Sequence, residues 1–95
     1  MSEIRITRRH DLPPGEARAA AEQMARGLRK KHGLSYEWAD DERLCFRGPG
    51  VHGELEMEVE QVTVVVSLSF LLAPFRGVLE QEIHEYFDER FGTGA

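Results

Sequence analysis

The stretch Val51-His-Gly-Glu-Leu-Glu-Met-Glu-Val-Glu-Gln-Val-Thr-Val-Val-Val-Ser-Leu-Ser-Phe70 decides the fold. Apolar and polar residues alternate up to Glu60, and the apolar phase resumes at Val62 and continues to Leu68. Successive side chains of a strand point to opposite faces of the sheet, so this pattern gives one apolar face and one largely acidic face. It predicts a β-hairpin that turns at Glu60-Gln61.

The register of this hairpin follows from matching its apolar residues. We expect three apolar pairs across it: Val59–Val62, Met57–Val64 and Leu55–Val66. A slip of one residue would move these side chains to the opposite face. A preceding strand at 43–47 would add three further pairs: Arg47–Glu54, Cys45–Glu56 and Arg43–Glu58. The arginines would then neutralise part of the acidic face, which argues against a metal or acid/base site there.

The rest of the chain supplies one further strand on each side of a helix, and then a second helix. Residues 3–9 and 34–38 alternate as strands. The first of them suits a sheet edge, but the sequence leaves open whether it joins either edge or sits between other strands. A helix from about Gly15 to His32, with Gly33 as its cap, has an alanine-rich apolar face: Ala17, Ala20, Ala21, Met24 and Leu28. A second helix, from about Pro74 to Phe91, has an aromatic-rich stripe: Phe75, Val78, Leu79, Ile83, Tyr86, Phe87 and Phe91.

The predicted fold class is therefore α+β, with the element order β-α-β-β-β-β-α. Short links make consecutive strands antiparallel, and the alternation requires one covered face and one face in water. Both helices have a single apolar stripe, so both should pack on the same face of a mainly antiparallel sheet. We expect a two-layer sandwich that forms a single domain over residues 1–95.

Composition excludes several classes of function. The net charge of −5 argues against binding to nucleic acid, which requires an excess of lysine and arginine. The only cysteine, Cys45, cannot form an intrachain disulfide. No apolar run has the length of a membrane span, and the N-terminal residues lack the apolar core of a signal peptide, so we expect a cytoplasmic protein.

No group of residues has the spacing of a catalytic, cofactor or metal site. Glu80, His84 and Asp88 stack on one helix face, but a solvated surface explains them better than a metal site. Cys45 has no base positioned by sequence. The run Arg29-Lys-Lys-His32 offsets the negative end of the helix dipole or, alternatively, forms a patch for an anionic surface. We therefore expect a protein that is not an enzyme and binds no cofactor.

The link between the last strand and the last helix is the strongest candidate for a partner surface. It contains Phe70, Leu71, Leu72 and Phe75, which cannot all point into so small a core. They form an exposed apolar patch for a partner or are buried at the end of the sheet, and the sequence leaves both open. Val65, on the polar face, would extend such an interface.

The chain as a whole resembles a small bacterial family called "putative polyhydroxyalkanoic acid system proteins". The resemblance rests on Ile4-Arg-Ile-Thr-Arg-Arg-His-Asp-Leu12, Lys31-His-Gly-Leu-Ser-Tyr-Glu-Trp38, Leu44-Cys-Phe-Arg-Gly-Pro-Gly-Val-His-Gly53 and the segment 68–83. It implies an accessory, regulatory or granule-associated role in polyhydroxyalkanoate storage, with the storage granule or its coat proteins as partners. The family brings no catalytic residues to carry over. The alternative is a generic protein-interaction or homodimerisation module, which the edge strand 3–9 and Val65 favour.

Overall fold

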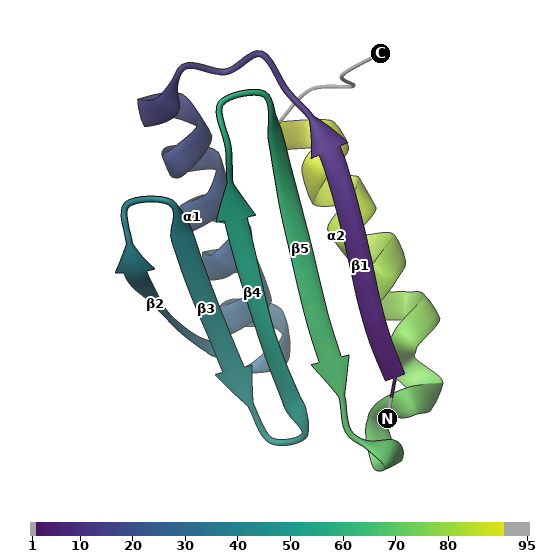
Figure 1. The fold of residues 1–95 in the computed structure, drawn as a ribbon. Helices are drawn as coiled ribbons and strands as arrows, with labels where there is room; N and C mark the ends of the chain where they lie inside the picture. The colour runs from purple at the N-terminus through teal and green to yellow at the C-terminus, as the bar shows by residue number, and fades with distance from the viewer. Residues whose placement is uncertain (1, 91–95) are drawn as a thin grey trace.

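The computed structural model describes residues 2–90, which form a five-stranded antiparallel sheet with two α-helices on one of its faces (Figure 1). The elements follow the predicted order: β1 (Ser2–Arg9), α1 (Pro14–His32), β2 (Ser35–Asp40), β3 (Arg43–Gly48), β4 (Val51–Met57), β5 (Gln61–Leu68), a 3-10 helix η1 (Phe70–Phe75) and α2 (Arg76–Arg90). The predicted fold class, an α+β sandwich of two layers, is confirmed.

The strand order is β1-β5-β4-β3-β2, so the first two strands of the chain lie at opposite edges of the sheet. β1 pairs with β5, with Ile4 opposite Val66 and Ile6 opposite Val64. α1 crosses the apolar face and connects one edge to the other (Figure 1). The sequence leaves the place of the first strand open, and the structure puts it at an edge, beside the last strand of the chain.

α1 begins and ends where its sequence predicts. Pro14 occupies the first turn, where a missing N–H removes no intrahelical hydrogen bond. Gly33 follows the helix in the left-handed conformation (φ 71°), and its N–H donates to the carbonyl oxygen of Arg29. The predicted apolar face is buried, and Ala25 joins it. Alanines let the helix backbone approach the sheet closely.

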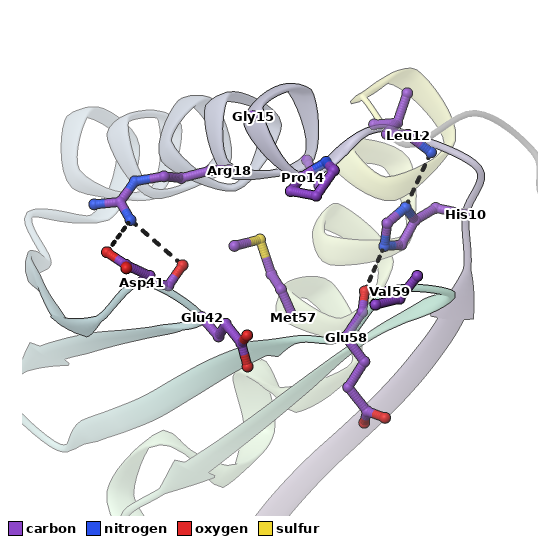
Figure 2. Close-up of a pocket in the computed structure, with 11 residues that line it drawn as sticks. His10, Leu12, Pro14, Gly15, Arg18, Asp41, Glu42, Met57, Glu58 and Val59 are labelled. Carbon is purple, nitrogen blue, oxygen red and sulfur yellow. Dashed lines mark hydrogen bonds and ion pairs between the residues drawn. The ribbon is translucent and has the colours of Figure 1, made fainter.

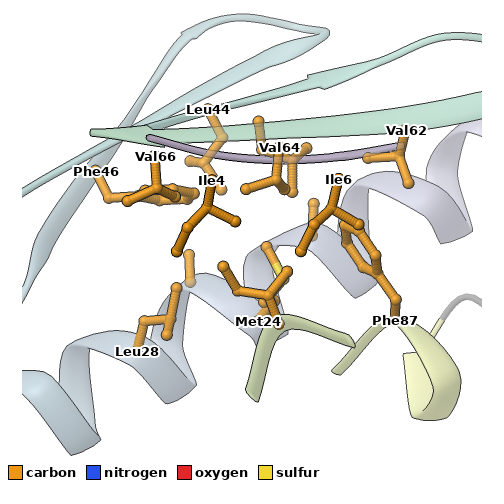
Figure 3. Packing of buried hydrophobic residues seen from close by; sticks show 14 of the residues in the cluster. Ile4, Ile6, Met24, Leu28, Leu44, Phe46, Val62, Val64, Val66 and Phe87 are labelled. Carbon is orange, nitrogen blue, oxygen red and sulfur yellow. The ribbon is translucent and has the colours of Figure 1, made fainter. Parts of the chain in front are cut away.

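The core lies between the helices and the inner face of the sheet (Figure 3). The strands contribute alternate residues, and the helices contribute residues one turn apart. The strand residues are Ile4, Ile6, Leu44, Phe46, Leu55, Met57, Val62, Val64, Val66 and Leu68. The helices add the α1 face together with Leu79, Ile83 and Phe87 of α2. The helices also touch each other, because a Cβ at Gly27 of α1 would overlap the ring of Tyr86.

The predicted strand registers are wrong by two residues. Met57 lies opposite Val62, Leu55 opposite Val64 and Gly53 opposite Val66. On the other side of β4, Arg43 lies opposite Glu56, Cys45 opposite Glu54 and Arg47 opposite His52. A slip of two residues keeps the side chains that remain in the strands on their predicted faces, so the apolar and polar faces of β3, β4 and β5 are as expected.

Two local features explain this shift. The N–H of Glu58 donates to the carbonyl oxygen of Gln61 at 2.7 Å, which places Val59 and Glu60 in the turn. Val59, predicted to face the core, is 83% exposed. Gly53 lies under the ring of Phe46, where any Cβ would come within 2.8 Å of that ring. The predicted register would have placed the larger Leu55 opposite Phe46.

The start of the last helix also differs from prediction. α2 begins at Arg76, and Pro74 lies within η1. Of the predicted stripe, Leu79, Ile83 and Phe87 are buried and Tyr86 is half-buried. Phe75 and Val78 are exposed instead. Phe75 lies in η1, before α2 begins, and Val78 precedes the buried row Leu79–Ile83–Phe87 by one residue, so it projects to a neighbouring side of the helix. Phe91 lies outside the described residues.

Candidate functional site at the η1 end

The strand register places several segments at one end of the sandwich, which we call the η1 end. They are the start of β1, the β3–β4 turn, the end of β5, η1, the end of α1 and the start of α2 (Figure 1). The opposite end, which we call the turn end, contains the β1–α1 loop, the β2–β3 and β4–β5 turns and the end of α2.

Large apolar side chains are exposed at the η1 end. Phe70 and Leu71 are each 80% exposed, Phe75 is 59% exposed and Val78 is 56% exposed. We call these four residues the η1 patch. Scattered apolar residues are common on protein surfaces, but a contiguous group often marks a binding site. Outside the η1 patch, Val59 at the turn end is the exposed large apolar residue of the described chain.

The predicted partner residues divide into three groups. Phe70, Leu71 and Phe75 belong to the η1 patch. Leu72 is half-buried and packs against the core. Val65 is half-buried on the outer face of the sheet, between Arg5 of β1 and Glu54 of β4. It therefore does not extend the η1 patch.

Backbone hydrogen bonds explain why Phe70 and Leu71 face outward. The N–H of Ser69 donates to the carbonyl oxygen of Gly50 at 2.8 Å, and the N–H of Leu72 donates to that of Ser69 at 3.0 Å. These bonds fix η1 to the β3–β4 turn. Gly50 has φ 76° and leaves no room for a Cβ beside Leu72. In a 3-10 helix every third residue shares a side, so with Leu72 turned inward its two predecessors point away.

An apolar cavity of about 260 Å³ adjoins the η1 patch. Its walls come from both helices, η1, β4, β5 and the segments before β2 and β4: Leu34, Pro49, Val51, Leu68, Leu72, Phe75, Val78 and Leu79, with His32. Phe75 and Val78 belong to both the patch and the cavity. Sequence reasoning missed Val78 and the other walls, because no pattern within one segment shows which segments converge.

Glu82 of α2 joins the two helices beside this cavity. Its carboxylate contacts His32 Nε2 at 2.6 Å and Lys31 Nζ at 3.3 Å, and its side chain is only 13% exposed. Burial alone raises the pKa of Glu82, but the hydrogen bonds and charges of His32 and Lys31 outweigh burial and hold the pKa below its ordinary value. The end of α1 is thereby fixed against the start of α2.

A pH dependence follows from this lowered pKa. Such a carboxylate contributes its full stability above its ordinary pKa of about 4.3, and the contribution is lost as the pH falls through the lowered value. We expect Glu82→Gln to reduce the free energy of unfolding by about 1 kcal/mol at pH 7. We expect the variant to lose less stability than the parent between pH 5 and pH 3, measured by urea unfolding. Glu85→Gln, an exposed position on the same helix, should reproduce the parent's behaviour.

A second cavity, of about 310 Å³, lies at the turn end (Figure 2). Its buried polar group is His10, and both ring nitrogens are engaged. Nδ1 accepts from the N–H of Leu12 at 3.2 Å, so Nε2 carries the proton and donates to the carbonyl oxygen of Glu58 at 3.1 Å. The rim holds an ion pair between Arg18 and Asp41 at 3.1 Å. His10 thus connects the β1–α1 loop to the β4–β5 turn, so its role is structural.

The remaining candidates from the sequence take part in contacts between elements. Asp88 pairs with Arg8 of β1 at 2.6 Å, and Arg8 donates to His84 Nδ1 at 3.2 Å. Cys45 is half-buried on the outer face, opposite Glu37 and Glu54. Arg43 Nε lies 3.3 Å from a carboxylate oxygen of Glu54, so part of the acidic face is neutralised. Within residues 2–90, no group of three or more histidine, cysteine or acidic residues is arranged to hold a metal ion.

A family model described as "Putative polyhydroxyalkanoic acid system protein" matches residues 4–91, which is nearly the whole chain. The chain belongs to this family. The resemblance drawn from its sequence is thereby confirmed. Among curated proteins no relative is found. None of the helices within residues 2–90 is both long enough and apolar enough to cross a membrane.

Two solved structures have a similar fold. The NMR structure of PA4090 from Pseudomonas aeruginosa matches with a TM-score of 0.61 and 10% identity, over 94% of this chain and 83% of that one. The crystal structure of TTHA0849 from Thermus thermophilus matches with a TM-score of 0.52 and 15% identity, over 98% of this chain and 91% of that one. At such low identity the likeness concerns the fold alone.

Proposed function

We propose that this family member is a non-enzymatic accessory protein of polyhydroxyalkanoate storage that acts in the cytoplasm and docks on the granule through the η1 patch. The exposure of Phe70 and Leu71 carries the proposal, because both side chains are held outward by the hydrogen bonds of η1. Family membership supplies the link to polyhydroxyalkanoate. The histidine of each cavity, His10 or His32, is engaged in a structural contact, which favours a docking role over catalysis.

Burying the side chains of the η1 patch against a partner should contribute strongly to the free energy of docking. Fully burying a leucine or phenylalanine side chain is worth about 1.5–3 kcal/mol relative to leaving it in water. Phe70 and Leu71, together with the partly exposed Phe75 and Val78, give a docking free energy that corresponds to a micromolar dissociation constant only if most of the η1 patch is covered at once. A broad apolar surface, such as a granule or a coat protein on it, meets that condition.

Co-sedimentation of the purified protein with isolated polyhydroxyalkanoate granules tests the proposal. We expect enrichment above an unrelated acidic protein, and at least a tenfold weaker association for Leu71→Asp. Val59→Asp is the matched control, because Val59 is equally exposed but lies at the turn end. Equal binding of the two variants, or no enrichment of the parent, would contradict the proposal. Granules washed free of coat proteins separate binding to the granule body from binding to its coat.

A homodimerisation or protein-interaction module is the second candidate. β1 favours it, because an edge strand presents backbone groups on one side to a further strand. Val65 lies one strand away on the outer face. Sedimentation equilibrium at high micromolar concentration tests this candidate, and a purely monomeric protein would rule out the homodimer.

A further inference from the structure

Charged side chains are divided unevenly between the two ends of the sandwich. At the η1 end the basic residues are Arg29, Lys30, Lys31, Arg47 and Arg76, and the acidic residues are Glu3, Glu80 and Glu82. At the turn end the acidic residues are Asp11, Glu16, Asp40, Asp41, Glu42, Glu56, Glu58, Glu60, Asp88 and Glu89, against Arg8, Arg9, Arg18, Arg43 and Arg90. The η1 end is therefore net positive in a chain whose net charge is −5.

The basic residues lie close to the η1 patch. His32, in the last turn of α1, lines the cavity that Phe75 and Val78 also line. Lys31 contacts the same Glu82 carboxylate as His32, and Arg29 and Lys30 belong to the same helical turn. Arg76 stands directly after Phe75 in the chain and is exposed. In the ion pairs formed within residues 2–90, neither Arg29 nor Lys30 takes part. Their charges are available to a partner.

The helix dipole does not account for the whole cluster. Cations in the last turn of α1 do offset the negative end of its dipole. Arg76, however, is the first residue of α2, where the dipole disfavours a cation, and Arg47 lies on a strand. A common partner that carries negative charge explains both groups at once.

We propose that the η1 end binds an anionic lipid surface, with the η1 patch inserted among the acyl chains and the basic residues placed against the headgroups. This combination of exposed apolar side chains and flanking cations is what interfacial binding requires. The inference rests on the proposed function, and it names the chemistry of the surface that the protein meets. Lys31 pairs with Glu82 and Arg76 donates to the carbonyl oxygen of Glu3, but a bare polyester surface would leave Arg29 and Lys30 without a charged partner.

The acidic turn end does not cancel this attraction. An eight-residue strand such as β1 spans about 23 Å, which is nearly three Debye lengths at physiological ionic strength. The surface therefore acts mainly on the nearer, positive end. The turn end is repelled whenever it approaches, so the protein binds in one orientation only.

Vesicle co-sedimentation tests the inference. The probes are vesicles of equal parts phosphatidylcholine and phosphatidylglycerol, and vesicles of phosphatidylcholine alone. We expect at least tenfold tighter binding to the mixed vesicles, because each basic residue near an anionic surface contributes about fivefold in affinity. High salt should weaken this binding, and Leu71→Asp should abolish it.

Two double variants with the same change in net charge show which end of the sandwich binds the anionic vesicles. Arg29→Gln/Arg76→Gln should bind mixed vesicles at least tenfold more weakly than the parent. Arg9→Gln/Arg43→Gln, at the turn end, should bind mixed vesicles as tightly as the parent, because these residues lie far from the surface. All four positions are exposed, so far-UV circular dichroism should show an unchanged fold. Equal binding of the two double variants, or equal binding to neutral and mixed vesicles, would overturn the inference.

The same assay separates the two proposals. Binding to polyhydroxyalkanoate particles stripped of lipid, without binding to mixed vesicles, would overturn the lipid inference and leave granule docking intact. Failure to bind stripped particles, native granules and mixed vesicles would overturn both.

Discussion

Phe87→Ala is expected to lower the free energy of unfolding by about 3–5 kcal/mol. The side chain is completely buried, at the end of the α2 stripe that begins with Leu79 and Ile83. Figure 3 shows it beside Ile6 and Val62, where the last helix meets the edge strand and its neighbour. Removing the ring leaves a cavity between α2 and the sheet.

This loss is large for so small a protein. Domains of this kind have total stabilities of about 5–15 kcal/mol, so the variant should be largely unfolded at low concentrations of urea. The ring also supports the guanidinium of Arg8, which lies 5.7 Å from its centroid and pairs with Asp88. Equilibrium urea unfolding, followed by far-UV circular dichroism, measures the change.

Phe75→Ala provides a matched control. It makes the same chemical change at a side chain that is 59% exposed in the η1 patch. We expect a change within about 1 kcal/mol, because little apolar surface is removed from the core. A loss as large as that of Phe87→Ala would show that Phe75 is buried in solution, and would contradict the description of the η1 patch.

Gly53→Ala is expected to lower the free energy of unfolding by about 1–3 kcal/mol. A Cβ at this position would lie 2.7–2.8 Å from two ring carbons of Phe46 and 3.2 Å from a methyl carbon of Val66. These neighbours are buried and cannot move aside freely. Thermal and urea unfolding both report the change.

A helical glycine and a compensating variant test this explanation. Gly77→Ala, in α2, meets no atom within 4 Å, so it should stabilise the protein by about 0.5–1 kcal/mol. If Gly53→Ala acts by crowding Phe46, adding Phe46→Leu should cost less in the Gly53→Ala background than in the parent. Strict additivity of the two substitutions would argue against direct crowding.

The alternation of residues 51–68 predicts the two faces of the sheet but not its register. A slip of two residues leaves each side chain on the same face, so the pattern is equally satisfied by both registers. The choice depends on a contact between strands, in which Phe46 needs a glycine opposite it. No periodicity within one strand contains that information. The order of the elements and most of the amphipathic faces, by contrast, are local properties and are predicted correctly, with Val59, Phe75 and Val78 as the exceptions.

From the sequence, the residues of the candidate surface could be predicted only as a group, without showing which of them are exposed. The sequence indicates that the link after β5 has more large apolar side chains than the core can hold. It does not show that η1 turns Leu72 inward and leaves Phe70 and Leu71 outside, because an α-helix from Pro74 is equally compatible with the spacing. The positive charge of the η1 end is also hidden, since the acidic residues of the turn end dominate the net charge.

The pairing of the first strand with the last has a consequence for how the chain assembles during synthesis. Ile4 lies opposite Val66, so β1 leaves the ribosome long before the strand that it pairs with. β2 to β5 form a meander of sequential neighbours that can assemble as they emerge, whereas β1 must remain unpaired until β5 is complete. Arg5, Arg8 and Arg9 keep this waiting strand charged, which disfavours pairing with other nascent chains. The arginines of β1 are therefore expected to reduce association between chains that have not yet folded.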